Sequence, residues 1–125
     1  MKDGKTVILC IDDDPDILSY LRIVLESEGF VMAEAPSAED GLRAYKEKQP
    51  DLIIVDLMME EVDSGTGLLK ELRLLHNTAP VFMLSSVGDA LHGQLDYIDL
   101  GLAGVLQKPL DKETLLATLA AKLGA

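Results

Sequence analysis

The sequence is poor in cysteine, in basic residues and in long apolar runs, and each shortage excludes a class of protein. Its single cysteine, Cys10, can form no internal disulfide and has no companions for a metal site. The 11 basic residues stand against 22 acidic ones, and the net charge of −11 argues against binding to nucleic acid or to an anionic membrane. No apolar run approaches the roughly 20 residues that span a bilayer, and residues 1–6 show no signal-peptide pattern. We therefore expect a cytoplasmic protein without direct nucleic-acid or membrane contacts.

The chain does have enough apolar content for a core. Of its 125 residues, 48% are hydrophobic, which excludes a disordered acidic tail. We find no repeat, low-complexity tract or linker. The length and this uniformity predict one domain over residues 1–125.

Two periodicities alternate along the sequence. Short apolar runs, typical of buried strands, occur at Val7–Ile11, Phe30–Ala35, Leu52–Val55, Val81–Leu84 and Gly104–Leu106. Between and after them, apolar residues follow helical spacing at Ile17, Leu21, Val24 and Leu25; Ala38, Leu42 and Tyr45; Leu68, Leu69, Leu72 and Leu75; Leu91, Leu95 and Ile98; and Leu115, Leu116, Leu119 and Leu123. This alternation predicts an α/β fold with a parallel sheet covered on both faces.

Helix starts can also be located in the sequence. Asp14 followed by Pro15 is typical of an N-cap with proline at the first helical position. Ser37 with Asp40 resembles a capping box, and Asp111 is placed to cap the last helix.

Polar residues stand where the predicted strands end. They are Asp12, Asp13 and Asp14 after the first strand, Asp56 after the third, Ser85 and Ser86 after the fourth, and Lys108 just past the fifth. The carboxyl ends of parallel strands share one edge, where open α/β sheets bind ligands. The second strand ends in Ala35-Pro36 and is expected to contribute nothing there, as would suit an outer strand.

These residue types predict a phosphoryl site. Carboxylates about 4 Å apart repel by about 4 kcal/mol at an effective dielectric near 20, so the cluster needs a cation. Oxygen ligands in small number suit Mg²⁺, with Mn²⁺ as an alternative. Lys108 can pair with Asp56 or with a phosphoryl oxygen, and Ser85 offers a hydroxyl donor. Asp14 is better interpreted as a helix cap than as a ligand.

Four segments together resemble the receiver domains of two-component response regulators. They are residues 8–14, 50–59, 80–86 and 106–110, and the resemblance extends over essentially the whole chain. It implies a flavodoxin-like (βα)5 three-layer sandwich with a five-stranded parallel sheet in the order 2-1-3-4-5.

The resemblance also implies roles for the residues of the site. Asp56 would accept a phosphoryl group from a sensor histidine kinase or a phosphotransfer protein. Lys108 would bind a phosphoryl oxygen, and Ser85 would move toward the phosphoryl group as a switch. The Mg²⁺ ligands would be Asp13, Asp56 and the backbone carbonyl of Met58, with Asp12 acting through water.

The sequence departs from this family pattern at three places. Val105 stands where the family often has an aromatic switch residue, and Glu60 replaces a common proline. The loop at residues 61–67 is one residue longer than usual. The output is therefore expected to depend on Ser85 and backbone movement, and Glu60 and Glu61 are interpreted as solvated charges.

Two other functions are weighed against a receiver. One is a haloacid-dehalogenase-like phosphatase that uses Asp12 and Asp14, although Asp16 departs from its motif and no second acidic motif follows Lys108. The other is a pseudo-receiver that binds partners without phosphorylation. We favour a receiver that is no enzyme beyond self-catalysed phosphotransfer and autodephosphorylation. By resemblance it would signal to an unknown output domain or partner through the fourth predicted helix, the fifth strand and the last helix.

Overall fold

The chain folds around one parallel sheet. The computed structural model describes residues 6–56, 70–86, 103–108 and 111–123. Within these ranges the sheet has five strands in the order β2-β1-β3-β4-β5, and every neighbouring pair is parallel. The strands are β1 (Val7–Ile11), β2 (Val31–Ala35), β3 (Leu52–Asp56), β4 (Val81–Ser86) and β5 (Gly104–Lys108). The predicted flavodoxin-like fold class and strand order are confirmed, and β2 is an edge strand as expected.

Three strands extend further than their apolar runs predict. β3 includes Asp56, β4 includes Ser85 and Ser86, and β5 continues to Lys108. Neighbouring strands stay in register there, because Asp56 is paired with Leu84 and Ser86 with Lys108. The pairing of the backbone therefore continues where the side chains become polar, which an apolar pattern cannot reveal.

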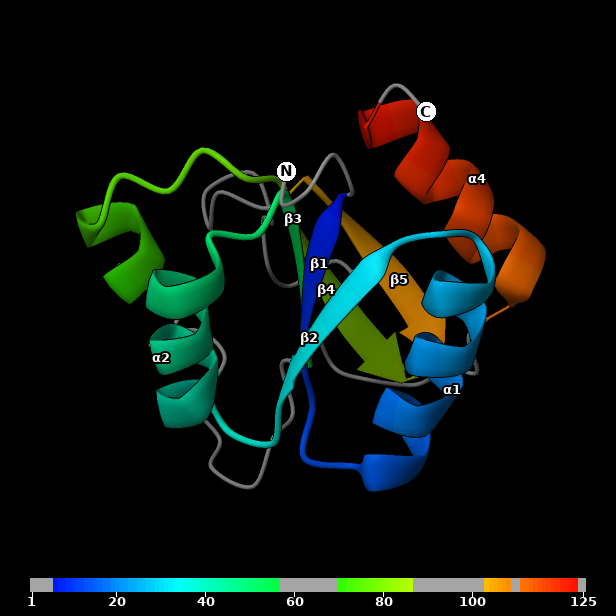
Figure 1. Cartoon of the computed structure of the whole chain (residues 1–125), viewed down its shortest axis with the longest axis horizontal. Helices are drawn as coiled ribbons and strands as arrows, with labels where there is room; N and C mark the ends of the chain where they lie inside the picture. Colours follow the sequence, from blue (N-terminus) through cyan, green and yellow to red (C-terminus); the bar gives the residue numbers. More distant parts are fainter. Residues whose placement is uncertain (1–5, 57–69, 87–102, 109–110, 124–125) are drawn as a thin grey trace.

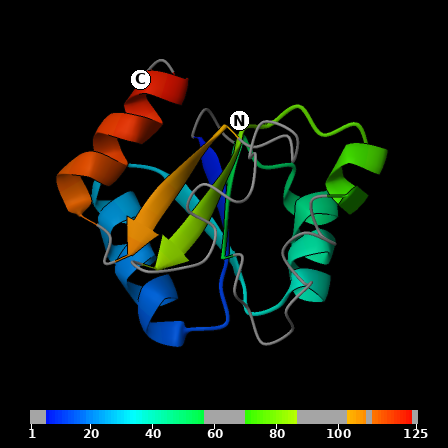
Figure 2. The ribbon, with the colours of Figure 1, turned by 180° about the vertical axis from the view of Figure 1, so that it is seen from behind.

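Helices cover both faces of the sheet. α1 (Pro15–Ser27) and α4 (Lys112–Leu123) lie on one face, while α2 (Ala38–Lys48) and the helical residues 70–74 lie on the other (Figures 1 and 2). Along β1, Ile8 and Cys10 belong to the first core and Leu9 and Ile11 to the second. All residues of β1 and β3 are buried, in agreement with the continuous apolar runs of a two-sided parallel sheet.

The predicted helix starts are confirmed. The Ser37 hydroxyl accepts a hydrogen bond from the amide of Asp40 at 3.1 Å and caps α2. The Asp111 carboxylate accepts from the amide of Thr114 at 2.9 Å before α4, and this bond lowers the pKa of Asp111. These caps set the points at which the chain turns from strand to helix.

The third predicted helical stripe is only partly correct. Leu72 is buried at 2% exposure, but Leu75 is 40% exposed, so the predicted stripe does not continue to position 75. The helical residues end at position 74, and His76 adopts a φ of 60°, so Leu75 lies in the turn and not on the stripe. Leu68, Leu69 and the fourth stripe at residues 91–98 lie outside the described residues.

Gln49 ends α2 with a left-handed backbone conformation, at φ 47° and ψ 66°. We expect Gln49→Gly to raise the free energy of unfolding by about 0.5–1 kcal/mol, because the steric cost of this conformation exceeds the extra chain entropy of glycine. Urea denaturation measures the change. Glu47→Gly, inside the same helix, serves as the control and should lower stability by about 0.5–1 kcal/mol. A Gln49→Gly protein no more stable than the original chain would contradict the expectation.

Candidate metal and phosphoryl site

Two aspartates meet where β1 and β3 end. Ile11 is paired with Val55, so the residues that follow them, Asp12 and Asp56, lie side by side at the carboxyl edge of the sheet. Asp12 is completely buried and Asp56 is 5% exposed. The sequence prediction that these two strand ends converge is confirmed.

The two buried aspartates and Asp13 form a cluster of carboxylates. Each residue offers one oxygen atom, and the three oxygens lie within 4.8 Å of one another. Asp13 is exposed, so the cluster opens to solvent on its side. At this separation each pair of charges repels by roughly 3 kcal/mol at an effective dielectric near 20. A divalent cation would offset that repulsion, and an all-oxygen donor set fits a hard ion such as Mg²⁺.

The backbone before α1 orients Asp12. The amide of Asp12 donates to the carbonyl oxygen of Ala35 at 3.1 Å, and the Oδ1 atom of Asp12 accepts from the amide of Asp14 at 2.9 Å. The Oδ1 atom of Asp14 in turn accepts from the amide of Asp16 at 2.9 Å, and Pro15 begins the helix. The interpretation of Asp14 as a helix cap is therefore confirmed. The positive end of the α1 dipole also lies near the acidic cluster.

Among the described residues, the second strand adds no side chain to the acidic cluster, as expected. Its backbone does take part at this edge, because the carbonyl oxygen of Ala35 accepts a hydrogen bond from the amide of Asp12. No sequence signal could have revealed this, because every residue type carries the same backbone carbonyl.

Ser85 and Lys108 are placed at the same edge by their backbones. Ser85 follows Leu84, the partner of Asp56, and Lys108 is paired with Ser86. Their side chains are outside what the structure describes, and so is that of Val105. Met58, Glu60 and the loop at residues 61–67 also lie outside the described residues, so the roles predicted for them stay predictions.

Cys10 and Arg22 have surroundings that indicate structural roles. Cys10 is completely buried in β1, and burial raises the pKa of its thiol, which disfavours a reactive thiolate. The side chain of Arg22 donates hydrogen bonds to Glu34 and Glu26, and these bonds raise the pKa of its guanidinium group. Neither residue belongs to the acidic cluster.

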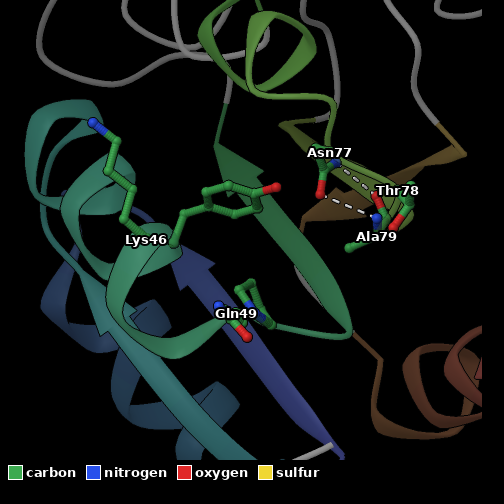
Figure 3. Close-up of a pocket in the computed structure, with 7 residues that line it drawn as sticks. Lys46, Gln49, Asn77, Thr78 and Ala79 are labelled. Carbon is green, nitrogen blue, oxygen red and sulfur yellow. Dashed lines mark hydrogen bonds between the residues drawn. The ribbon is translucent and has the colours of Figure 1, made fainter.

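A pocket of about 440 Å³ is lined by residues that precede β3 and β4 (Figure 3). Its lining residues are Tyr45, Lys46, Gln49, Pro50, Asn77, Thr78 and Ala79. The Asn77 side chain exchanges hydrogen bonds of 2.9 and 3.0 Å with the backbone of Ala79, so its polar atoms brace the turn before β4 (Figure 3). The chemistry-bearing residues lie at the opposite edge of the sheet.

The chain is similar to known signalling proteins. Its residues 8–120 match the family model of the response regulator receiver domain. It is 35% identical over 108 residues to the transcriptional regulatory protein GlrR of Escherichia coli K12, covering 86% of this chain and 24% of that protein. It is 38% identical over 118 residues to the DNA-binding dual master transcriptional regulator RpaA of Synechocystis, covering 93% of this chain and 48% of that protein.

Solved structures show the same similarity. The chemotaxis response regulator CheY4 of Vibrio cholerae superposes with a TM-score of 0.83 at 26% identity, covering 94% of this chain and 98% of that one. Within the described ranges, no helix combines the length and apolar character that crossing a bilayer requires. The family match, the strand order and the acidic cluster agree: this chain belongs to the response regulator receiver domain family.

Proposed function

We propose that the chain accepts a phosphoryl group on Asp56 with the help of a divalent cation, Mg²⁺ or Mn²⁺. The observation that carries this proposal is the meeting of three carboxylate oxygens within 4.8 Å, two of them from buried aspartates. Asp13 and Asp56 would bind the cation directly, Asp12 through water, and the Met58 carbonyl would complete the protein ligands. When bound, the cation neutralises charge on the phosphoryl oxygens.

The proposed reaction needs a nucleophile and a donor. An oxygen of Asp56 attacks phosphorus, a new O–P bond forms, and the bond from phosphorus to the histidine nitrogen of the donor breaks with its electron pair left on that nitrogen. Lys108 offers positive charge to a phosphoryl oxygen, and Ser85 donates a hydrogen bond from its hydroxyl. The donor would be a sensor histidine kinase or a phosphotransfer protein.

Signal output is part of the same proposal. Phosphorylation would shift Ser85 and its strand end, and the face made by residues 91–98, β5 and α4 would pass the change to an output domain or partner. The chain spans a quarter to a half of the length of GlrR and RpaA, which are transcriptional regulators. We propose that residues 1–125 act as one receiver domain in the cytoplasm, without direct contact with nucleic acid or membrane.

The phosphatase alternative is weakened by Asp14. That alternative needs Asp12 and Asp14 as a catalytic pair, but the Asp14 carboxylate is exposed and is engaged in capping α1. A pseudo-receiver would retain the fold and lack phosphorylation.

The experiment that separates these alternatives is site mapping after incubation with acetyl phosphate. With Mg²⁺, intact-mass measurement should show addition of one phosphoryl group, and peptide mass spectrometry should locate it on Asp56. Chelator should prevent the addition. A phosphoryl group on Asp12 would support the phosphatase, and no addition at all would leave a pseudo-receiver.

A further inference from the structure

Gly41 brings α2 into unusually close contact with β1. It is the one buried residue of this helix. A Cβ atom at position 41 would lie 2.5 Å from Cδ1, 2.9 Å from Cγ1 and 3.2 Å from Cγ2 of Ile11. No residue larger than glycine fits against Ile11 at this distance.

Ile11 is almost completely buried. Its side chain is 1% exposed and belongs to the core between the sheet and α2. A β-branched residue has few χ1 conformations, and here both branches would lie within 3.2 Å of the added Cβ atom. A side chain at position 41 must therefore displace the Ile11 side chain or the backbone that carries it.

Ile11 also stands next to both buried aspartates in the sheet. It is followed directly by Asp12, and it is paired with Val55, which is followed directly by Asp56. A displacement of Ile11 would change how the two carboxylates lie relative to each other.

The start of α2 is tied to the same region. The amide of Gly41 donates to the carbonyl of Ser37 at 2.8 Å, and Ser37 follows Ala35 by two residues. Ala35 accepts the hydrogen bond from Asp12. Moving α2 away from β1 would therefore also strain the contact that orients Asp12.

We infer that Gly41 is a positioning residue that sets the spacing of Asp12 and Asp56 through Ile11 and so favours Mg²⁺ over Ca²⁺. This inference rests on the proposed cation-dependent function. Mg²⁺ requires near-ideal octahedral geometry at about 2.0–2.1 Å, whereas Ca²⁺ accepts flexible geometry at about 2.3–2.6 Å. A shift of a few tenths of an ångström therefore affects Mg²⁺ more than Ca²⁺.

The test compares metal affinities of Gly41→Ala with those of the original chain, by calorimetric titration of each metal well below the melting temperature. Gly41→Ala should weaken Mg²⁺ binding about tenfold, as changes around metal ligands often do, and Ca²⁺ binding less than about threefold. Adding Ile11→Val removes the nearest atom, Cδ1, but keeps two branches that would lie 2.9 and 3.2 Å from the added Cβ atom, so it should restore Mg²⁺ affinity only in part.

Gly104→Ala is the matched control. A Cβ atom there would lie 3.0 Å from Cε2 of Phe82, at the amino end of β5, so it also crowds the core but away from the acidic cluster. It should lower the melting temperature without changing the ratio of Mg²⁺ to Ca²⁺ affinity. If Gly41→Ala does not fold on its own, the double variant Gly41→Ala with Ile11→Val is compared with Ile11→Val alone.

The outcomes separate the inference from the proposed function. If the original chain binds Mg²⁺ and Gly41→Ala has the same ratio of Mg²⁺ to Ca²⁺ affinity, the inference alone is overturned. An equal loss of affinity for both metals in Gly41→Ala, or the same loss of Mg²⁺ affinity in Gly104→Ala, also overturns it. If the original chain binds no Mg²⁺, the proposed function is overturned and the inference with it.

Discussion

Asp56→Asn is expected to abolish the Mg²⁺-dependent phosphorylation of this chain by acetyl phosphate. The amide of asparagine is a poor nucleophile, so no acyl phosphate can form at this position. The substitution nearly preserves side-chain volume at a residue that is 5% exposed, so the fold should persist. Intact-mass measurement over a time course gives the rate, and circular dichroism checks the fold.

Two further variants sharpen this test. Asp16→Asn changes an exposed carboxylate in the first turn of α1 and should leave the rate within about twofold, because exposed charges have small effects. Asp13→Asn retains the nucleophile and loses a proposed cation ligand, so it should slow the reaction and raise the Mg²⁺ concentration required. Phosphorylation that persists in Asp56→Asn would place the acceptor elsewhere.

The same Asp56→Asn substitution should stabilise the protein when divalent cations are removed. The carboxylate oxygens of the cluster lie within 4.8 Å of one another, and two of the three residues are shielded from water. Each pair contributes roughly 3 kcal/mol of repulsion at an effective dielectric near 20, and exposure of Asp13 reduces its share. We therefore expect the free energy of unfolding to rise by about 1–3 kcal/mol in chelator at neutral pH.

Added Mg²⁺ should stabilise the original chain more than it stabilises Asp56→Asn. The original chain gains about 2.7 kcal/mol at a free Mg²⁺ concentration 100 times its dissociation constant, while Asp56→Asn has lost a ligand and gains less. Urea denaturation with and without Mg²⁺ measures both effects, and Asp16→Asn controls for the change in net charge. A variant less stable than the original in chelator would mean that crowding of the carboxylates is not the dominant energy at this site.

Much of the site could be predicted because parallel strands bring the polar residues at their carboxyl ends to the same edge of the sheet. The runs that end at Ile11 and Val55 are buried on both faces, so parallel pairing brings the next residues, Asp12 and Asp56, to one edge. Asp13 joins them as the neighbour of Asp12 along the chain. The cap at Asp14 could be predicted because the local chemistry of an aspartate before proline suffices to start a helix.

Other features depend on tertiary contacts that no local pattern encodes. The exposure of Leu75 follows from where the helical residues stop and from the left-handed turn at His76. The contact between Gly41 and Ile11 joins a helix and a strand, and the sequence gives no distance between them. The side chains of Ser85 and Lys108 lie outside the described part of the chain, so their roles stay predictions.

The most direct test of the cation site is anomalous scattering from a crystal of this chain soaked in Mn²⁺. The proposal predicts a single strong peak between the carboxylates, within bonding distance of Asp13 and Asp56 at about 2.1 Å, as for octahedral Mg²⁺. Asp12 should contact the ion through water. Mn²⁺ peaks only elsewhere on the acidic surface, with the cluster empty, would contradict the proposed cation-dependent phosphoryl transfer to Asp56.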